Sequence, residues 1–113
     1  MKTLKSFLAI LLITVSSSLF AQNKQTTDTV KVWGNCDMCQ GKIEKAAKAA
    51  GAATAKWDVD SKILSVSYIP GKGSMEKIEK AVAAVGYDTE HQTATDKAYN
   101  KLSGCCQYDR KAN

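Results

Sequence analysis

The ten residues K-I-E-K-A-A-K-A-A-G at positions 42–51 return as K-I-E-K-A-V-A-A-V-G at positions 77–86. Each copy ends in glycine, the residue that most easily takes up the left-handed conformation after a helix. The repeat predicts two amphipathic helices of the same kind. The apolar positions at helical spacing are Ile43, Ala46, Ala47 and Ala50 in the first copy and Ile78, Val82 and Val85 in the second.

The segments around these helices alternate apolar and polar residues with a period of two, as strands covered on one face do. The alternation runs through residues 29–32, 53–59 and 64–68, and a weaker strand is predicted at 87–92. The short turn at 58–62 favours an antiparallel hairpin. The predicted fold class is α+β, a ferredoxin-like β-α-β-β-α-β sandwich whose four-stranded antiparallel sheet carries both helices on one face.

The first residues have the layout of a secretory signal peptide. M-K-T-L-K is followed by the apolar run F-L-A-I-L-L-I-T-V and then by mostly small residues up to Ala21. This run is shorter than the about 20 apolar residues that a membrane-spanning helix needs. We therefore predict a signal peptide at residues 1–21, cleavage near Ala21, and a mature protein in the periplasm or outside the cell.

The rest of the chain has room for one small domain. We predict a short linker at 22–28, the domain at 29–92 and a C-terminal extension at 93–113. The net charge of +5 comes from 16 lysine and arginine residues against 11 acidic ones, and two of the lysines lie in the predicted signal peptide. The sequence has no basic stripe interleaved with aromatic residues, so nucleic acid is not an expected partner.

Two cysteines, Cys36 and Cys39, lie where the first predicted strand gives way to the first helix. The shift that superimposes the two repeats places Cys39 opposite Ser74, a residue type that favours helix N-caps. Free backbone N–H groups and the helix dipole favour a thiolate at such a position. Since the second repeat has no cysteines, the fold does not need them, and we predict that the pair serves chemistry.

Residues 29–92 resemble the heavy-metal-associated domain, the family of copper chaperones, N-terminal modules of copper-pumping ATPases and periplasmic mercury carriers. The family motif Gly-Met-Thr-Cys-x-x-Cys corresponds to G-N-C-D-M-C here. Gly34 stands where the family has its methionine, and the nearest methionine is Met38 inside the loop. The resemblance implies metal binding by the two cysteines, with the ring of Tyr87 beside the metal.

Two thiolates on one loop suit a soft ion that accepts low coordination, so Cu(I) is expected first and Hg(II) second. Zn(II) prefers four ligands and would be underfilled by Cys36 and Cys39 alone. Asp37 and Met38 lie between the cysteines and are predicted to surround the ligands; the carboxylate keeps Zn(II) or Cd(II) as an alternative. The predicted function is an exported metallochaperone or scavenger, with a metal-transporting membrane protein as its candidate partner.

A thiol-disulfide oxidoreductase is the main alternative, because thioredoxin also places C-x-x-C at a helix start. Such an enzyme needs a cis-proline facing the cysteines, whereas Pro70 lies in the turn-like I-P-G-K-G. A structural use, with the four cysteines in two disulfides, is a second alternative. The sequence contains no hydrolytic triad, phosphate loop or catalytic carboxylate pair, so we predict that the protein is not an enzyme.

The C-terminal extension carries a second pair of cysteines, Cys105 and Cys106. The segment D-K-A-Y-N-K-L at 96–102 predicts a short helix, and Gly104 allows the chain to turn after it. If this helix packs beside the sheet, one cysteine of the second pair approaches the first pair. We therefore predict a three- or four-sulfur site, with a disordered extension as the alternative.

Overall fold

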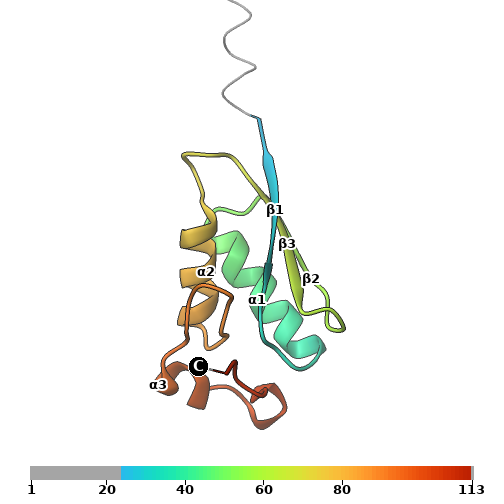
Figure 1. Cartoon of the computed structure of the whole chain (residues 1–113), viewed down its shortest axis with the longest axis vertical. Helices are drawn as coiled ribbons and strands as arrows, with labels where there is room; N and C mark the ends of the chain where they lie inside the picture. Colours follow the sequence, from blue (N-terminus) through green and yellow to red (C-terminus); the bar gives the residue numbers. More distant parts are fainter. Residues whose placement is uncertain (1–23, 113) are drawn as a thin grey trace, which may run out of the picture.

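The computed structural model describes residues 24–112, and the predicted signal peptide lies outside this range. Figure 1 shows two helices on one face of a sheet and a short third helix at the lower end. No helix within 24–112 is long and apolar enough to cross a membrane. The elements follow as β1 (Thr26–Lys31), α1 (Asp37–Ala49), β2 (Thr54–Trp57), β3 (Ile63–Tyr68), α2 (Met75–Ala84), α3 (Asp96–Asn100) and the 3-10 helix η2 (Gly104–Cys106).

The sheet is antiparallel with the strand order β1-β3-β2. β1 begins at Thr26, so the last residues of the predicted linker already pair with β3. Alternate strand positions face the helices, as the period of two predicts. The buried strand residues are Val30, Ala55, Trp57, Leu64, Val66 and Ser67, with Val32 directly after β1.

The hairpin between β2 and β3 forms where the sequence predicts it. The carboxylate of Asp58 accepts the backbone N–H groups of Asp60 at 2.9 Å and Ser61 at 2.8 Å. Lys62 completes the turn with a φ of 63°, which lies in the left-handed region. These local bonds close the turn and fix the register of the two strands.

Both repeated segments form helices that end at their glycines. Gly51 and Gly86 follow the helix ends with φ values of 112° and 110°. After α2, the N–H of Tyr87 reaches back to the carbonyl of Val82 at 3.3 Å, as in a glycine-terminated helix. Val85, one of the apolar positions of the second repeat, lies outside the core: it is the C-cap residue, 42% exposed, and it lines an open groove between α1, α2 and α3.

The predicted fourth strand is not present as a strand within the described residues. Its segment, 87–92, meets the end of β1 through one bridge between Val32 and Thr89. The backbone groups that would extend the ladder have other partners. The N–H of Asp88 binds the Tyr108 hydroxyl, and the N–H of Lys31 binds a carboxylate oxygen of Glu90.

The C-terminal extension is a folded part of the molecule, so the alternative of a disordered extension is wrong. α3 is shorter than the predicted 96–102 and begins at a cap in which Thr95 accepts the N–H of Ala98. Further along, Tyr108 stacks on Tyr87 with ring centroids 5.6 Å apart. The hydroxyl of Tyr108 donates to the Gly86 carbonyl at 2.7 Å.

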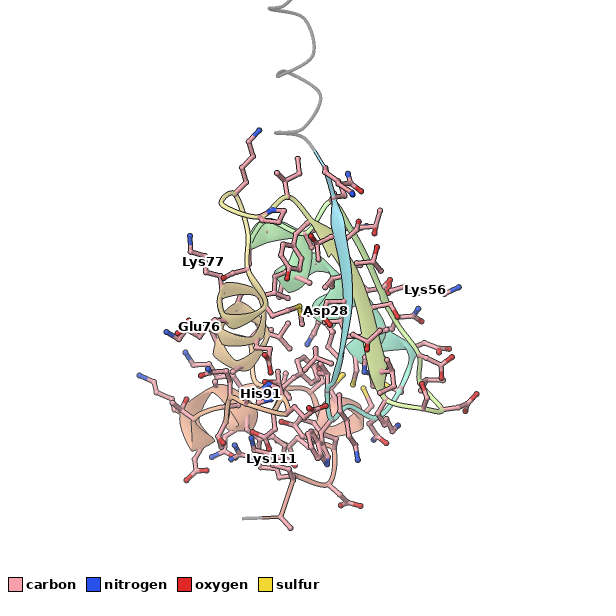
Figure 2. All side chains as sticks on the ribbon, turned by 45° about the horizontal axis from the view of Figure 1, so that its top comes forward. Asp28, Lys56, Glu76, Lys77, His91 and Lys111 are labelled. Carbon is pink, nitrogen blue, oxygen red and sulfur yellow. The ribbon has the colours of Figure 1, made fainter. Side chains whose placement is uncertain are left out.

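Charged residues fasten the end of the extension to the segment after α2. The guanidinium of Arg110 donates to both carboxylate oxygens of Asp88, at 2.8 and 3.1 Å, and to Asp96 at 2.7 Å. Burial alone would raise the pKa of Asp88, but Arg110 and the N–H of Ala94 hold it below its usual value. Figure 2 shows Lys111 beside the segment that carries His91, at the end of the molecule where α1 begins.

Candidate metal centre

The first two cysteines stand at the start of α1. Cys36 is the N-cap residue, with an extended backbone, and its side chain makes no capping hydrogen bond. Cys39 lies in the first turn and is fully buried. Their sulfurs are 3.9 Å apart and are not bonded to each other. The predicted position of the pair at a helix start is confirmed, with Cys36 rather than Cys39 as the cap residue.

The loop before these cysteines is braced by a tryptophan. Gly34 is buried, and a Cβ atom added to it would lie 2.8 Å from the ring of Trp57. The indole N–H of Trp57 donates to the carbonyl of Val32 at 3.0 Å, just before the loop. The tryptophan ring thus packs against the loop at the position where the family methionine would stand, and only glycine leaves room for it.

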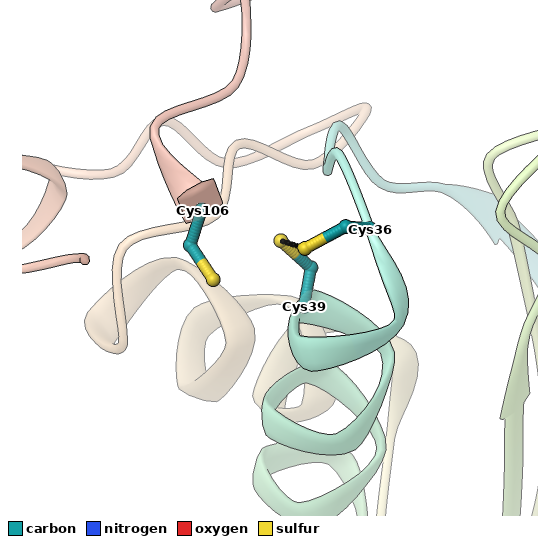
Figure 3. Close-up of side chains that lie close together, drawn as sticks. All are labelled: Cys36, Cys39 and Cys106. Atoms are coloured by element: carbon teal, nitrogen blue, oxygen red, sulfur yellow. Dashed lines mark hydrogen bonds between the residues drawn. The ribbon is translucent and has the colours of Figure 1, made fainter. Parts of the chain in front are cut away.

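The extension brings a third sulfur to the pair. Cys106, the last residue of η2, is fully buried, and its side chain points towards those of Cys36 and Cys39 (Figure 3). The three sulfur atoms all lie within 4.8 Å of one another. We call these three residues the three-sulfur cluster.

The spacing of the sulfurs suits a metal ion placed between them. Metal–sulfur bonds of about 2.3 Å put two thiolates about 4.0 Å apart in a trigonal plane and about 4.6 Å apart in a linear complex. The Cys36–Cys39 separation of 3.9 Å is close to the trigonal value. Small side-chain rotations would bring the third sulfur to the same spacing, so the cluster can surround a three-coordinate ion.

The buried thiols differ in how readily they ionise. Burial alone would raise the pKa of Cys39, but backbone hydrogen bonds of Cys36 and Asn35, with the nearby Tyr87 and Cys106, lower it overall. Burial and the neighbouring Cys39 sulfur raise the pKa of Cys106 to about 12. Cys39 therefore ionises first, and Cys106 keeps its proton until a cation takes its place.

Tyr87 lies where the family resemblance implies, beside the sulfurs. Its side chain is fully buried, and its hydroxyl has no hydrogen-bond partner within the described residues. Burial raises the pKa of Tyr87, and the nearby sulfurs of Cys39 and Cys106 raise it further. The hydroxyl therefore stays neutral and faces the cluster as a free donor, which favours negative charge on the sulfurs.

The remaining predicted site residues, Asp37, Met38 and Cys105, lie outside the three-sulfur cluster. Asp37 is exposed at the first position of α1, where a carboxylate suits the helix dipole, and it does not join the group of close ligand atoms found within 24–112. Cys105 is exposed, and its thiol donates to the sulfur of Met38 at 3.6 Å. Of the second cysteine pair, only Cys106 reaches the first pair.

Some residues that build the site were not singled out in the sequence. The amide of Asn35 donates to the carbonyl of Cys105 at 3.1 Å and so joins the loop to the extension. Tyr108 and Arg110 hold η2 in place through the segment after α2.

Known proteins resemble the chain in sequence and in fold, although no family model matches it. The copper chaperone CopZ of Staphylococcus haemolyticus (strain JCSC1435) is 33% identical over 57 residues, which are 50% of this chain and 84% of CopZ. Oxidized MerP from Ralstonia metallidurans CH34 superimposes with a TM-score of 0.56 at 26% identity, covering 61% of this chain and 100% of MerP. The apo N-terminal domain of the zinc(II) ATPase ZiaA gives 0.51 at 28% identity and 80% of each chain.

Proposed function

Because the chain belongs to the heavy-metal-associated domain family, we propose that it is an exported soft-metal-ion binding protein, a carrier or scavenger of Cu(I). The observation that carries the proposal is the cluster of three cysteine sulfurs within 4.8 Å of one another. Thiolates are soft ligands, and Cu(I) accepts two or three of them without needing more. Hg(II) has the same preference and is the second ion to test.

Burial suits the cluster to holding copper in its reduced state. Cys39 and Cys106 are fully buried and Cys36 is partly buried, so the ion would have little contact with water. An apolar shell of this kind favours the low charge and low coordination of Cu(I) over more strongly hydrated ions. The third thiolate shields the ion further, which favours retention over rapid exchange.

An anaerobic titration with Cu(I) against a calibrated chelator tests the proposal. We expect Cys36→Ser and Cys39→Ser each to weaken binding more than about 100-fold, since each removes a direct ligand. Met75→Leu, which removes a sulfur at the start of α2, is the matched control and should bind like the wild type. Equal affinity in the wild type and both cysteine variants would refute the proposal.

X-ray absorption of the Cu(I) form measures the number of sulfur ligands. We expect three in the wild type and two in Cys106→Ser. A count of two in both proteins would remove Cys106 from the ligands and leave the loop cysteines as the binding pair.

Zn(II) is the third candidate cargo, because three thiolates leave one position of a tetrahedral site to fill. The likeness to the N-terminal domain of a zinc(II) ATPase supports this test and supports a metal-transporting membrane protein as the partner. Competition between Zn(II) and Cu(I) for the purified protein ranks the two ions. If Zn(II) displaces Cu(I) at equal concentration, Zn(II) replaces Cu(I) as the proposed cargo, and the three cysteines remain the proposed ligands.

The proposal also separates a carrier from a thiol-disulfide oxidoreductase. We expect the reduced protein to bind metal tightly and to show little reduction of insulin disulfides. Turnover comparable with thioredoxin would favour the enzyme. Native mass spectrometry of protein recovered from the producing cells tests export, because it reports cleavage near Ala21 together with the bound metal.

A further inference from the structure

One pair of sulfurs near the cluster has no role in the proposed binding site. Cys105 is exposed, and Met38 on the first turn of α1 is 55% exposed, so both sulfurs are open to solvent. Their sulfur atoms lie 3.6 Å apart although the residues are far apart in the sequence. We call Cys105 and Met38 the outer sulfur pair.

The outer pair adjoins the three-sulfur cluster. The sulfur of Cys105 is 3.9 Å from that of Cys106, a separation that one metal ion can bridge. The carbonyl of Cys105 is held by the side chain of Asn35 at 3.1 Å and by the thiol of Cys36 at 3.5 Å. Residue 105 is therefore fixed beside the loop, and the sulfurs form a continuous series from the surface to the buried cluster.

The two ends of this series differ in strength as ligands. Met38 offers a neutral thioether, a weak and soft donor that has no proton to lose. Cys39 and Cys106 offer buried thiols that bind as thiolates and are shielded from water. A soft ion is therefore held loosely at the outer pair and tightly in the cluster.

We propose that the outer sulfur pair is an acceptor site that receives Cu(I) at the surface and passes it to Cys106. The inference rests on the proposed function, since it assumes that the cluster holds the ion. Its chemical class is that of a mixed thioether–thiolate site, which selects Cu(I) over Zn(II) because Zn(II) binds thioethers poorly.

The transfer is a sequence of ligand exchanges that needs no oxidant or reductant. Cu(I) binds the sulfurs of Met38 and Cys105, and the Cys105 thiol releases its proton to solvent. A Cu–S bond to Cys106 then forms as the bond to Cys105 breaks, and the Cys106 proton passes to the Cys105 sulfur. The bond to Met38 breaks as the sulfurs of Cys36 and Cys39 bind the ion, any proton they carry passes to solvent, and copper remains Cu(I) throughout.

The rate of Cu(I) loading tests the acceptor site. We expect Met38→Leu and Cys105→Ser each to slow transfer from a Cu(I)–chelator complex by about tenfold in anaerobic stopped-flow measurements. The final affinity and the count of three sulfurs should not change, because the cluster is intact. Met75→Leu is the matched control and should load at the wild-type rate.

A comparison with Zn(II) separates the acceptor role from packing. Leucine keeps the apolar contact of Met38 and removes only the sulfur, so Zn(II) loading should be the same in Met38→Leu and the wild type. Equal slowing of both ions would show that Met38 merely supports the loop, and wild-type Cu(I) loading in both outer-pair variants would also overturn the inference. Failure of the proposed function gives a different result, namely no tight Cu(I) binding by the wild type itself.

Discussion

The two main helices begin at opposite ends of the molecule (Figure 1). They differ in whether the side chain of the N-cap residue binds a backbone N–H of the first turn. At the start of α2, the hydroxyl of Ser74 accepts the N–H of Lys77 at 3.2 Å. At the start of α1, Cys36 occupies the same N-cap position but makes no capping bond with its side chain. A serine cap stabilises a helix by about 1 kcal/mol, so α1 lacks a stabilisation that α2 has.

The difference shows that the N-terminus of α2 is built for helix stability and that the N-terminus of α1 is built to bind a ligand. Ser74 satisfies a backbone donor of its own helix, whereas the sulfurs at the start of α1 face each other and Cys106. The extension covers the start of α1 and leaves the start of α2 at the other end of the molecule (Figure 1). The candidate metal centre thus lies where the first repeat differs from the second, at the cysteines that begin α1.

Replacing Cys36 by serine gives α1 the same cap residue as α2, and we expect the largest effect here. Cu(I) affinity should fall more than about 100-fold, while the free energy of unfolding of the metal-free protein stays the same or rises by up to about 1 kcal/mol. The reciprocal change Ser74→Cys should lower stability without creating a metal site. Chelator competition and urea unfolding measure the two quantities. If Cys36→Ser kept its Cu(I) affinity and lost stability, Cys36 would be a structural cap residue and not a metal ligand.

The ion pair between Asp88 and Arg110 fastens the C-terminal extension over the start of α1, and its removal tests how much that contact stabilises the fold. We expect Asp88→Asn to lower the free energy of unfolding by about 2 kcal/mol, because its charged hydrogen bonds to Arg110 are buried on the Asp88 side. The pKa of Asp88 is lowered in the folded protein, so its stabilisation is complete above the unfolded value of about 3.9. It disappears as the pH falls through the lower folded pKa. Urea unfolding as a function of pH measures this loss, which Asp88→Asn should not show.

The fit of Trp57 against the loop predicts opposite effects for two glycines. Gly34→Ala places a methyl group against the indole and should destabilise the protein by about 1 to 2 kcal/mol. Gly41→Ala has nothing within 4 Å of the new Cβ and lies inside α1, so it should stabilise by about 0.5 to 1 kcal/mol. Thermal unfolding followed by circular dichroism compares them. Similar shifts in the two variants would mean that Trp57 does not brace the loop.

The smallest effect belongs to the start of α2. Ser74→Ala removes the capping hydrogen bond and should cost about 1 kcal/mol of stability. Cu(I) affinity should be unchanged, since the helix start is remote from the sulfurs. A measurable loss of affinity in this variant would show that the two helix starts are coupled.

The regular parts of the fold were predictable because their signals are local. The repeat predicted α1 and α2, the alternation of residues such as Val30 and Leu64 predicted the buried face of the sheet, and Cys36 and Cys39 were placed at a helix start. Each of these rests on residues that are close in the sequence. The family resemblance added Tyr87, whose ring the structure places near Cys39 and Cys106; its role beside a metal stays a prediction.

The errors arise where distant segments compete for the same groups. The pattern of segment 87–92 is that of a strand, but the Tyr108 hydroxyl binds the N–H of Asp88 and the Glu90 carboxylate binds the N–H of Lys31, two donors that a longer fourth strand would pair. The close fit of Gly34 to Trp57 and the choice between Cys105 and Cys106 also depend on packing across the whole fold. No local pattern contains this information, because the partners are far apart in the chain.

The position of Cys106 makes the metal a cross-link between the start and the end of the fold. An ion bound to Cys36 and Cys106 would close a chain loop that contains both main helices and the entire sheet except β1. Closing a loop of about 70 residues restricts the unfolded chain enough to stabilise the folded state by about 4 kcal/mol, as a disulfide of that span would. The bound ion would therefore also act as a reversible cross-link. The unfolding force and the Tm of the protein would be higher when the ion is bound.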